Sequence, residues 1–144
     1  MKMELPLSYR WFRAQTISTL IPWHFLEPDD AKFKTVRDMF RKEDGGTRDL
    51  VCFAHRQDCD DFAGFEIKIG QITDRVIYFH PAFNGMPNDS IITGEYEDFW
   101  KFLCEVIIRD TADWSSEYDL KDLEEKNKTP NQQIQTIAAK RGSV

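Results

Sequence analysis

The stretch from Leu50 to His80 constrains the fold of this chain more than any other part of the sequence. The segment 50–54 is apolar at every position, which is typical of a strand that is covered on both faces. After a turn, apolar residues alternate with small or charged ones through residues 63–69, the period of a strand with one buried face. These patterns predict three adjoining strands, near 50–55, 62–69 and 75–80.

Two helices and an edge strand complete the predicted elements. Acidic residues after Pro28 and the pair Gly45–Gly46 bound a helix near 29–43. A second helix is predicted near 95–109, because apolar residues recur on one helical face at Tyr96, Phe99, Trp100, Leu103 and Ile107. The intervening segment 81–94 has the composition of a long surface loop. Residues 20–26 contain Pro22, which places that strand at an edge.

These elements predict an α+β fold with a single antiparallel or mixed sheet. Its strands lie near 20–26, 50–55, 62–69 and 75–80, and its helices lie near 29–43 and 95–109. We expect one domain over residues 1–114. Residues 115–144 form a polar C-terminal extension that cannot bury much apolar surface, with a short helix near 130–141.

Charge and cysteine usage limit the partners and the compartment. The formal net charge of −6 disfavours a nucleic-acid ligand and fits a basic protein partner. The alternative explanation of this charge is that it only keeps the protein soluble. Three cysteines without a CxxC pair indicate no disulfide framework. No run of 18 apolar residues occurs, so we expect a cytoplasmic protein that does not associate with a membrane.

The turn at Asp58, Asp60 and Asp61 raises the question of a bound cation. An EF-type calcium loop that starts at Asp58 requires Gly at its sixth position and Glu at its twelfth, where this chain has Ala63 and Ile69. We therefore predict no metal there, and a structural turn ordered by hydrogen bonds to the Asp side chains. No thiol or hydroxyl is visibly paired with a base, so we predict no catalytic residue and no cofactor.

An alternative is a metal-dependent hydrolase or nuclease. Glu66 and Lys68 lie on the same side of the predicted strand, and with Asp60 or Asp61 they resemble the D…ExK arrangement that holds Mg²⁺. The acidic net charge opposes nucleic-acid binding. We therefore favour Glu66 and Lys68 as the wet face of an amphipathic strand.

Four stretches, taken in order, resemble the SUKH superfamily, which groups bacterial immunity proteins with fungal cell-wall-assembly regulators. They are LIPWHFL, LVCFAHRQDCDDFAGFEI, VIYFHPAF and EYEDFWKFLCEVIIRDTADW. The resemblance covers about residues 16 to 114. The matching positions are Asp58, Asp60, Asp61, His80, Phe99 and Trp100. The segment after His80 and the C-terminal extension depart from the family pattern.

The resemblance implies a non-enzymatic immunity protein that neutralises a cognate bacterial toxin by binding and occluding it. A basic toxin would be attracted by the acidic chain. The expected partner-binding residues are the carboxylates Asp58, Asp60, Asp61, Glu95, Glu97 and Asp98. A regulatory scaffold of the same fold, without a toxin, is the remaining alternative.

Overall fold

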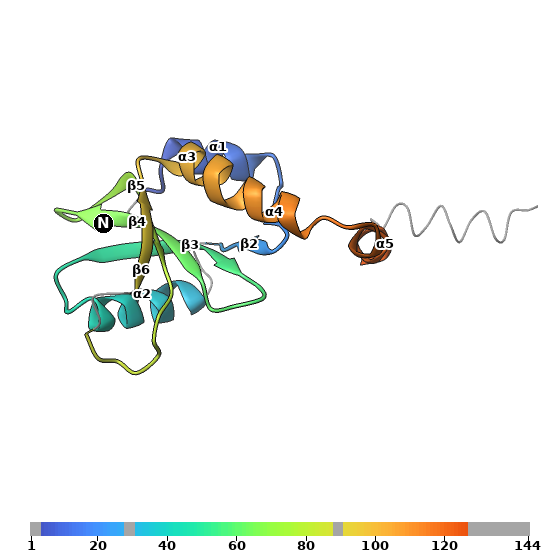
Figure 1. Ribbon diagram of the computed structural model, residues 1–144. Helices are drawn as coiled ribbons and strands as arrows, with labels where there is room; N and C mark the ends of the chain where they lie inside the picture. Colours follow the sequence, from blue (N-terminus) through green and yellow to red (C-terminus); the bar gives the residue numbers. More distant parts are fainter. Residues whose placement is uncertain (1–3, 28–30, 88–90, 127–144) are drawn as a thin grey trace, which may run out of the picture. The chain divides into compact units, whose positions relative to one another are not determined.

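The computed structural model describes residues 4–27, 31–87 and 91–126 (Figure 1). The chain divides into two compact units, residues 1–113 and residues 114–144. In the described residues, the first unit contains an antiparallel sheet of six strands in the order β1-β2-β3-β4-β5-β6. The strands are β1 (Thr19–Leu20), β2 (Trp23–Phe25), β3 (Asp49–Arg56), β4 (Phe62–Lys68), β5 (Gln71–Phe79) and β6 (Ile92–Tyr96). The predicted α+β class is confirmed.

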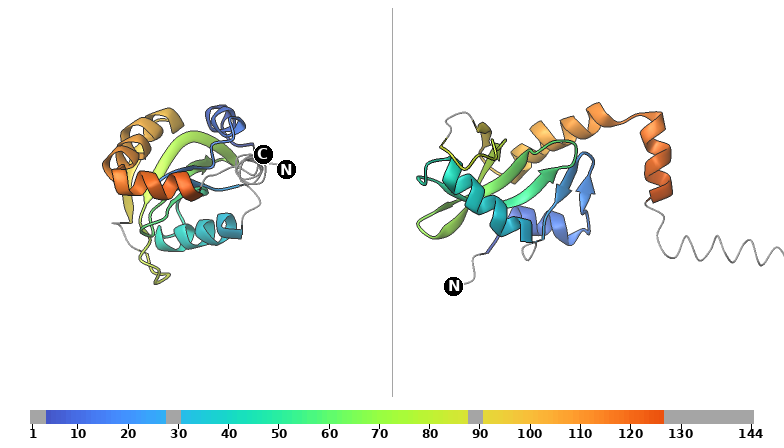
Figure 2. Two further views of the ribbon diagram at one scale, coloured as in Figure 1. Left: turned by 90° about the vertical axis from the view of Figure 1, so that its right-hand side faces the viewer. Right: turned by 90° about the horizontal axis from the view of Figure 1, so that it is seen from below.

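Helices cover both faces of this sheet (Figures 1 and 2). Helix α1 (Leu7–Ala14) lies over one face, beside a continuous helix formed by α3 (Phe99–Phe102), the π-helical segment η1 (Leu103–Ile107) and α4 (Ile108–Trp114). Helix α2 (Ala31–Glu43) lies over the other face.

Each face of the sheet buries its own apolar cluster. The cluster under α1 and α3 is mainly aromatic and includes Tyr9, Phe53, Phe65, Phe99 and Phe102. The cluster under α2 includes Phe40, Leu50, Phe62, Ile77 and Phe79. Burial of one such side chain contributes about 1.5–3 kcal/mol. This double cover explains why the sequence is apolar without interruption in the middle of β3.

Three predicted strands and one predicted helix match the structure closely. The strands near 50–55, 62–69 and 75–80 correspond to β3, β4 and β5, and the helix near 29–43 corresponds to α2. The predicted edge strand near 20–26 is divided into β1 and β2, which pair as a short hairpin around Ile21 and Pro22. The edge position is confirmed because β1 is the first strand of the sheet.

Two predictions around residue 95 are wrong. The segment 81–94 is not entirely a loop, because β6 begins at Ile92 and pairs with β5. Strand β6 extends to Tyr96, so the helix predicted from residue 95 begins at Phe99. Because the helix begins at Phe99, Tyr96 does not belong to its buried face, and that face differs from the predicted one. Trp100, which was predicted to lie on it, is 40% exposed. The buried stripe consists of Phe99, Phe102, Leu103, Val106 and Ile107.

The second unit is described only in its first part, which contains helix α5 (Glu117–Lys126). The short helix predicted near 130–141 lies outside the described residues. Within the described residues, no helix combines the length and the apolar character needed to cross a membrane.

Candidate functional site

The acidic turn between β3 and β4 is tied into the fold through Arg56, the last residue of β3. Its Nε donates to Asp58 at 2.6 Å, and its Nη1 donates to Asp110 of α4 at 3.2 Å. Partial burial raises the pKa of the Asp58 carboxyl, but the hydrogen bond and charge of Arg56 outweigh this effect and lower the pKa. Asp58 therefore serves the fold as an ion-pair partner.

Asp61, at the other end of the turn, is engaged by two side chains from β5 and the residue after it. The Tyr78 hydroxyl donates to one Asp61 oxygen at 2.5 Å, and Nδ1 of His80 lies 2.6 Å from the other. Burial and the neighbouring Asp61 raise the pKa of the Tyr78 phenol. Asp60 is exposed and has no hydrogen bond or ion pair with the described residues. Of the three aspartates, Asp60 is the one left available to a partner.

The other three predicted contacts lie on β6 and in the two residues between β6 and α3. Glu95 accepts hydrogen bonds from two arginines, and Asp98 caps α3 by accepting from the Lys101 backbone N–H at 2.9 Å. Glu97 is exposed and, within the described part of the chain, has no hydrogen bond or ion pair. Among the six predicted carboxylates, Asp60 and Glu97 alone are not engaged by described residues.

The ligand set of the hydrolase alternative is not assembled. Asp61 immediately precedes β4 and Glu66 lies five residues further along the chain, a separation of about 16 Å in an extended strand. The prediction that Glu66 faces water is also wrong, because the residue is 3% exposed on the α2 side of a sheet that is covered on both faces. Within the described residues, no group of three or more His, Cys, Asp or Glu side chains could hold a metal ion.

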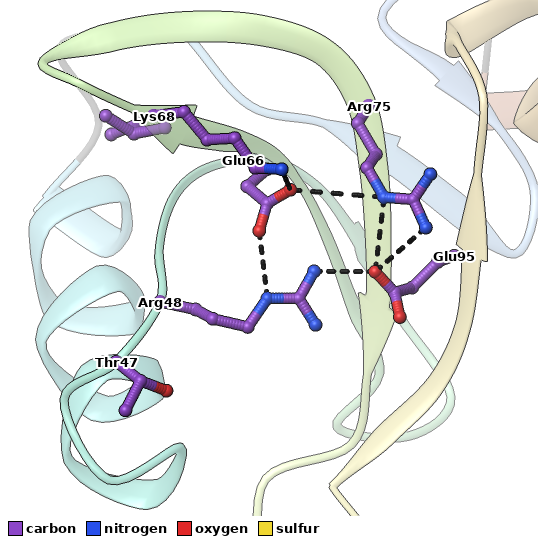
Figure 3. Close-up of a pocket in the computed structure, with 7 residues that line it drawn as sticks. Thr47, Arg48, Glu66, Lys68, Arg75 and Glu95 are labelled. Carbon is purple, nitrogen blue, oxygen red and sulfur yellow. Dashed lines mark hydrogen bonds and ion pairs between the residues drawn. The ribbon is translucent and has the colours of Figure 1, made fainter.

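Glu66 belongs instead to a hollow that we call the polar pocket (Figure 3). Its volume is about 540 Å³, and it is lined by Thr47, Arg48, Glu66, Ile67, Lys68, Arg75 and Glu95. The lining comes from the loop after α2 and from β4, β5 and β6, so it unites segments that are far apart in the sequence. No local pattern in the sequence indicates this pocket, because strand β6 was not predicted and the arginines follow no motif.

Ion pairs organise the polar pocket. Arg48 donates from Nε to Glu66 at 2.9 Å and from Nη2 to Glu95 at 2.6 Å, and Arg75 donates from Nε to Glu95 at 3.2 Å. The Arg48 hydrogen bond, its charge and the contribution of Arg75 lower the pKa of the Glu95 carboxyl despite partial burial. The same carboxylates raise the pKa of Arg48. Arg48 and Glu95 are therefore both charged at neutral pH.

A pair of exposed tryptophans lies on the opposite face of the domain. Trp11 of α1 is 60% exposed and Trp100 of α3 is 40% exposed, and their rings meet edge to face at 6.0 Å. The Trp100 ring also contacts the ring of the buried Phe99, with a distance of 5.5 Å between the ring centroids. Tryptophan is among the residue types most enriched at the energetically dominant centres of protein interfaces. The sequence placed Trp100 in the core, so this feature was missed.

Comparisons with models of known protein families, with curated proteins and with solved structures give no significant match. The SUKH resemblance therefore remains a prediction from the sequence.

Proposed function

We propose that this chain is a non-enzymatic protein-binding module, an immunity protein that neutralises a cognate bacterial toxin by binding and occluding it. The observation that carries protein binding is the exposed pair Trp11–Trp100. Two large aromatic side chains that contact each other outside the core supply apolar contact area, and tryptophan loses little side-chain entropy on binding because it has only two χ angles. The choice of a toxin as partner rests on the resemblance to immunity proteins.

One carboxylate near this pair and the net charge of the chain support the choice of a basic partner. Glu97 lies three residues before Trp100, is exposed and is not used by the described part of the fold. The chain as a whole carries −6, which speeds encounter with a cationic surface such as the substrate groove of a nuclease toxin. In this proposal the tryptophans anchor the complex, and Glu97 and Asp60 supply complementary charge.

Co-expression with a toxin-like protein encoded beside this gene tests the proposal. We expect the wild-type chain to restore growth and to co-purify with the toxin. The double variant Trp11→Ala with Trp100→Ala removes the anchor, and loss of a central aromatic contact costs about 2 kcal/mol or more, a weakening of at least about 30-fold.

Met86→Ala is the matched control, because Met86 is also an exposed apolar side chain (63% exposed) but lies away from the tryptophans, on the loop after β5. Hydrogen bonds to Glu43 join this loop to α2, on the opposite face of the sheet from Trp11 and Trp100. Circular dichroism verifies that both variants are folded. If growth is not restored by the wild-type chain, the immunity function is refuted. If the tryptophan variant protects as well as Met86→Ala does, the tryptophans are not the contact face.

If the chain is a regulatory scaffold, it binds a protein that is not toxic when expressed alone. The same tryptophan variant then weakens that complex, but cells that express the partner grow equally well with the wild-type chain and with the variant.

A further inference from the structure

The polar pocket carries excess positive charge in an otherwise acidic chain. Arg48, Lys68 and Arg75 supply three cations against the two carboxylates of Glu66 and Glu95, which leaves a net charge of +1 in the pocket. The formal charge of the whole chain is −6. The local excess of positive charge therefore attracts a small anion, although the chain as a whole is acidic.

The three cations are not equally engaged. Arg48 bridges both carboxylates, and Arg75 donates to Glu95. The Lys68 ammonium lies 3.7 Å from Oε1 of Glu66, which is too far for a hydrogen bond, and its side chain is 65% exposed. Lys68 therefore has donors to spare and the freedom to close over a ligand.

Glu66 provides a second, independent observation. Its Oε2 accepts from Arg48, but Oε1 is buried and accepts no hydrogen bond from any described residue. Oε1 lies between Lys68 at 3.7 Å and Nε of Arg75 at 3.9 Å, and Figure 3 shows these groups pointing toward one another. A buried carboxylate oxygen without a donor is unfavourable, so a ligand that brings its own hydrogen is preferred at this position.

We propose that the polar pocket binds a small oxyanion that also carries a hydrogen, for which inorganic phosphate is the simplest example. The anionic oxygens accept hydrogen bonds from the Lys68 ammonium and the Arg75 guanidinium, both of which are charged donors. The P–O–H group, which inorganic phosphate retains at neutral pH, donates to Oε1 of Glu66. Sulfate has a similar size and charge but carries no hydrogen at this pH, so it leaves Oε1 without a donor.

Titration of the full-length, ¹⁵N-labelled chain with phosphate and with sulfate at equal ionic strength and pH 7 tests both parts of the proposal. We expect saturable shifts of the Lys68 and Arg75 amide signals with phosphate, and binding of sulfate that is at least about tenfold weaker. Equal affinity for the two anions would overturn the role of Glu66. Absence of saturable shifts with phosphate would overturn the site itself.

Lys68→Gln supplies the matched variant, because the side chain is exposed and its replacement removes the 3.7 Å ion pair with Glu66 but no hydrogen bond among the described residues. We expect phosphate affinity to fall at least about tenfold. Lys101→Gln, at an exposed position on α3 outside the pocket, leaves it unchanged. Thermal unfolding verifies that both variants are folded, and unchanged affinity in Lys68→Gln contradicts the proposal. The test needs no protein partner, so its outcome is independent of the toxin-binding function.

Discussion

The hairpin between β4 and β5 places an isoleucine where the backbone favours another residue. Lys68 pairs with Gln71, so Ile69 and Gly70 form a two-residue turn, and both have positive φ angles, 52° and 70°. Two positive φ angles are the pattern of a type I′ turn, in which Asn-Gly is the preferred pair. A β-branched residue in this conformation is strained because its Cβ crowds the backbone.

Replacement of Ile69 by Asn should therefore stabilise the protein. The left-handed conformation costs a residue with a bulky side chain roughly 1–2 kcal/mol, and Asn adopts it at a lower cost. Ile69 is 102% exposed, so the substitution forfeits no buried apolar area. The net expectation is a gain of about 1 kcal/mol, which corresponds to a rise in Tm of roughly 4 °C for a domain of this size.

Urea unfolding monitored by circular dichroism measures the effect. We expect the midpoint to rise in Ile69→Asn while the m-value stays the same, because the area exposed on unfolding hardly changes. Ile69→Val is the control: it shortens the side chain but keeps the branch at Cβ, so the strain and the stability should remain close to wild type. If Ile69→Asn is no more stable than Ile69→Val, the turn is not strained and the reasoning is refuted.

Three further outcomes are expected. Gly64→Ala should destabilise the fold by about 1–3 kcal/mol in urea unfolding, because the added Cβ would lie 2.7 Å from Leu50 Cδ1 and 2.8 Å from the Val51 carbonyl oxygen; wild-type stability would contradict this. In the same assay, the contribution of three carboxyls to stability should be fully present above about pH 5 and be lost as the pH falls further, because arginine partners hold their folded-state pKa below the unfolded value. Unchanged stability down to pH 2 would contradict this. These carboxyls are Asp49, Asp58 and Glu95. Burial and the charge of Asp61 raise the pKa of the Cys59 thiol to about 11, so little reactive thiolate is present at this position at pH 8. Iodoacetamide should therefore label the exposed Cys104 before Cys59, and mass spectrometry of the modified peptides measures the order.

The order of the central elements could be predicted from the sequence because each has a strong local signal. The uninterrupted apolar run in β3 and the amphipathic sequence of α2 are examples. Strand β6 has five residues, includes Gly94 and follows a segment with loop composition, so its local signal is weak. Its place is determined by pairing with β5, a long-range interaction that periodicity does not report.

The candidate sites were less predictable, because their residues are defined by tertiary contacts. An exposed Asp and an Asp held by Tyr78 and His80 look alike in a sequence, as do Asp60 and Asp61 here. Glu66 fits the alternation of apolar and polar residues that is typical of a strand with one face in water. It is buried all the same, because Arg48, which lies 18 residues earlier in the chain, pairs with its charge. Alternation assigns a side chain to one side of a strand, and only the elements packed on that side decide whether the side chain meets water.

The two proposals use opposite faces of one sheet, and β4 links them directly. Phe65 points into the aromatic cluster that supports α1 and α3, whereas its neighbour Glu66 points into the polar pocket. Because packed β-strands do not deform freely, a partner at Trp100 and an anion beside Glu66 should bind independently unless β4 shifts between two positions. A change in toxin affinity on addition of phosphate would reveal such a shift, and linkage then requires the toxin to change phosphate affinity by the same factor. Measurement of both affinities in the presence and absence of the other ligand therefore decides whether the sheet separates the two sites or couples them.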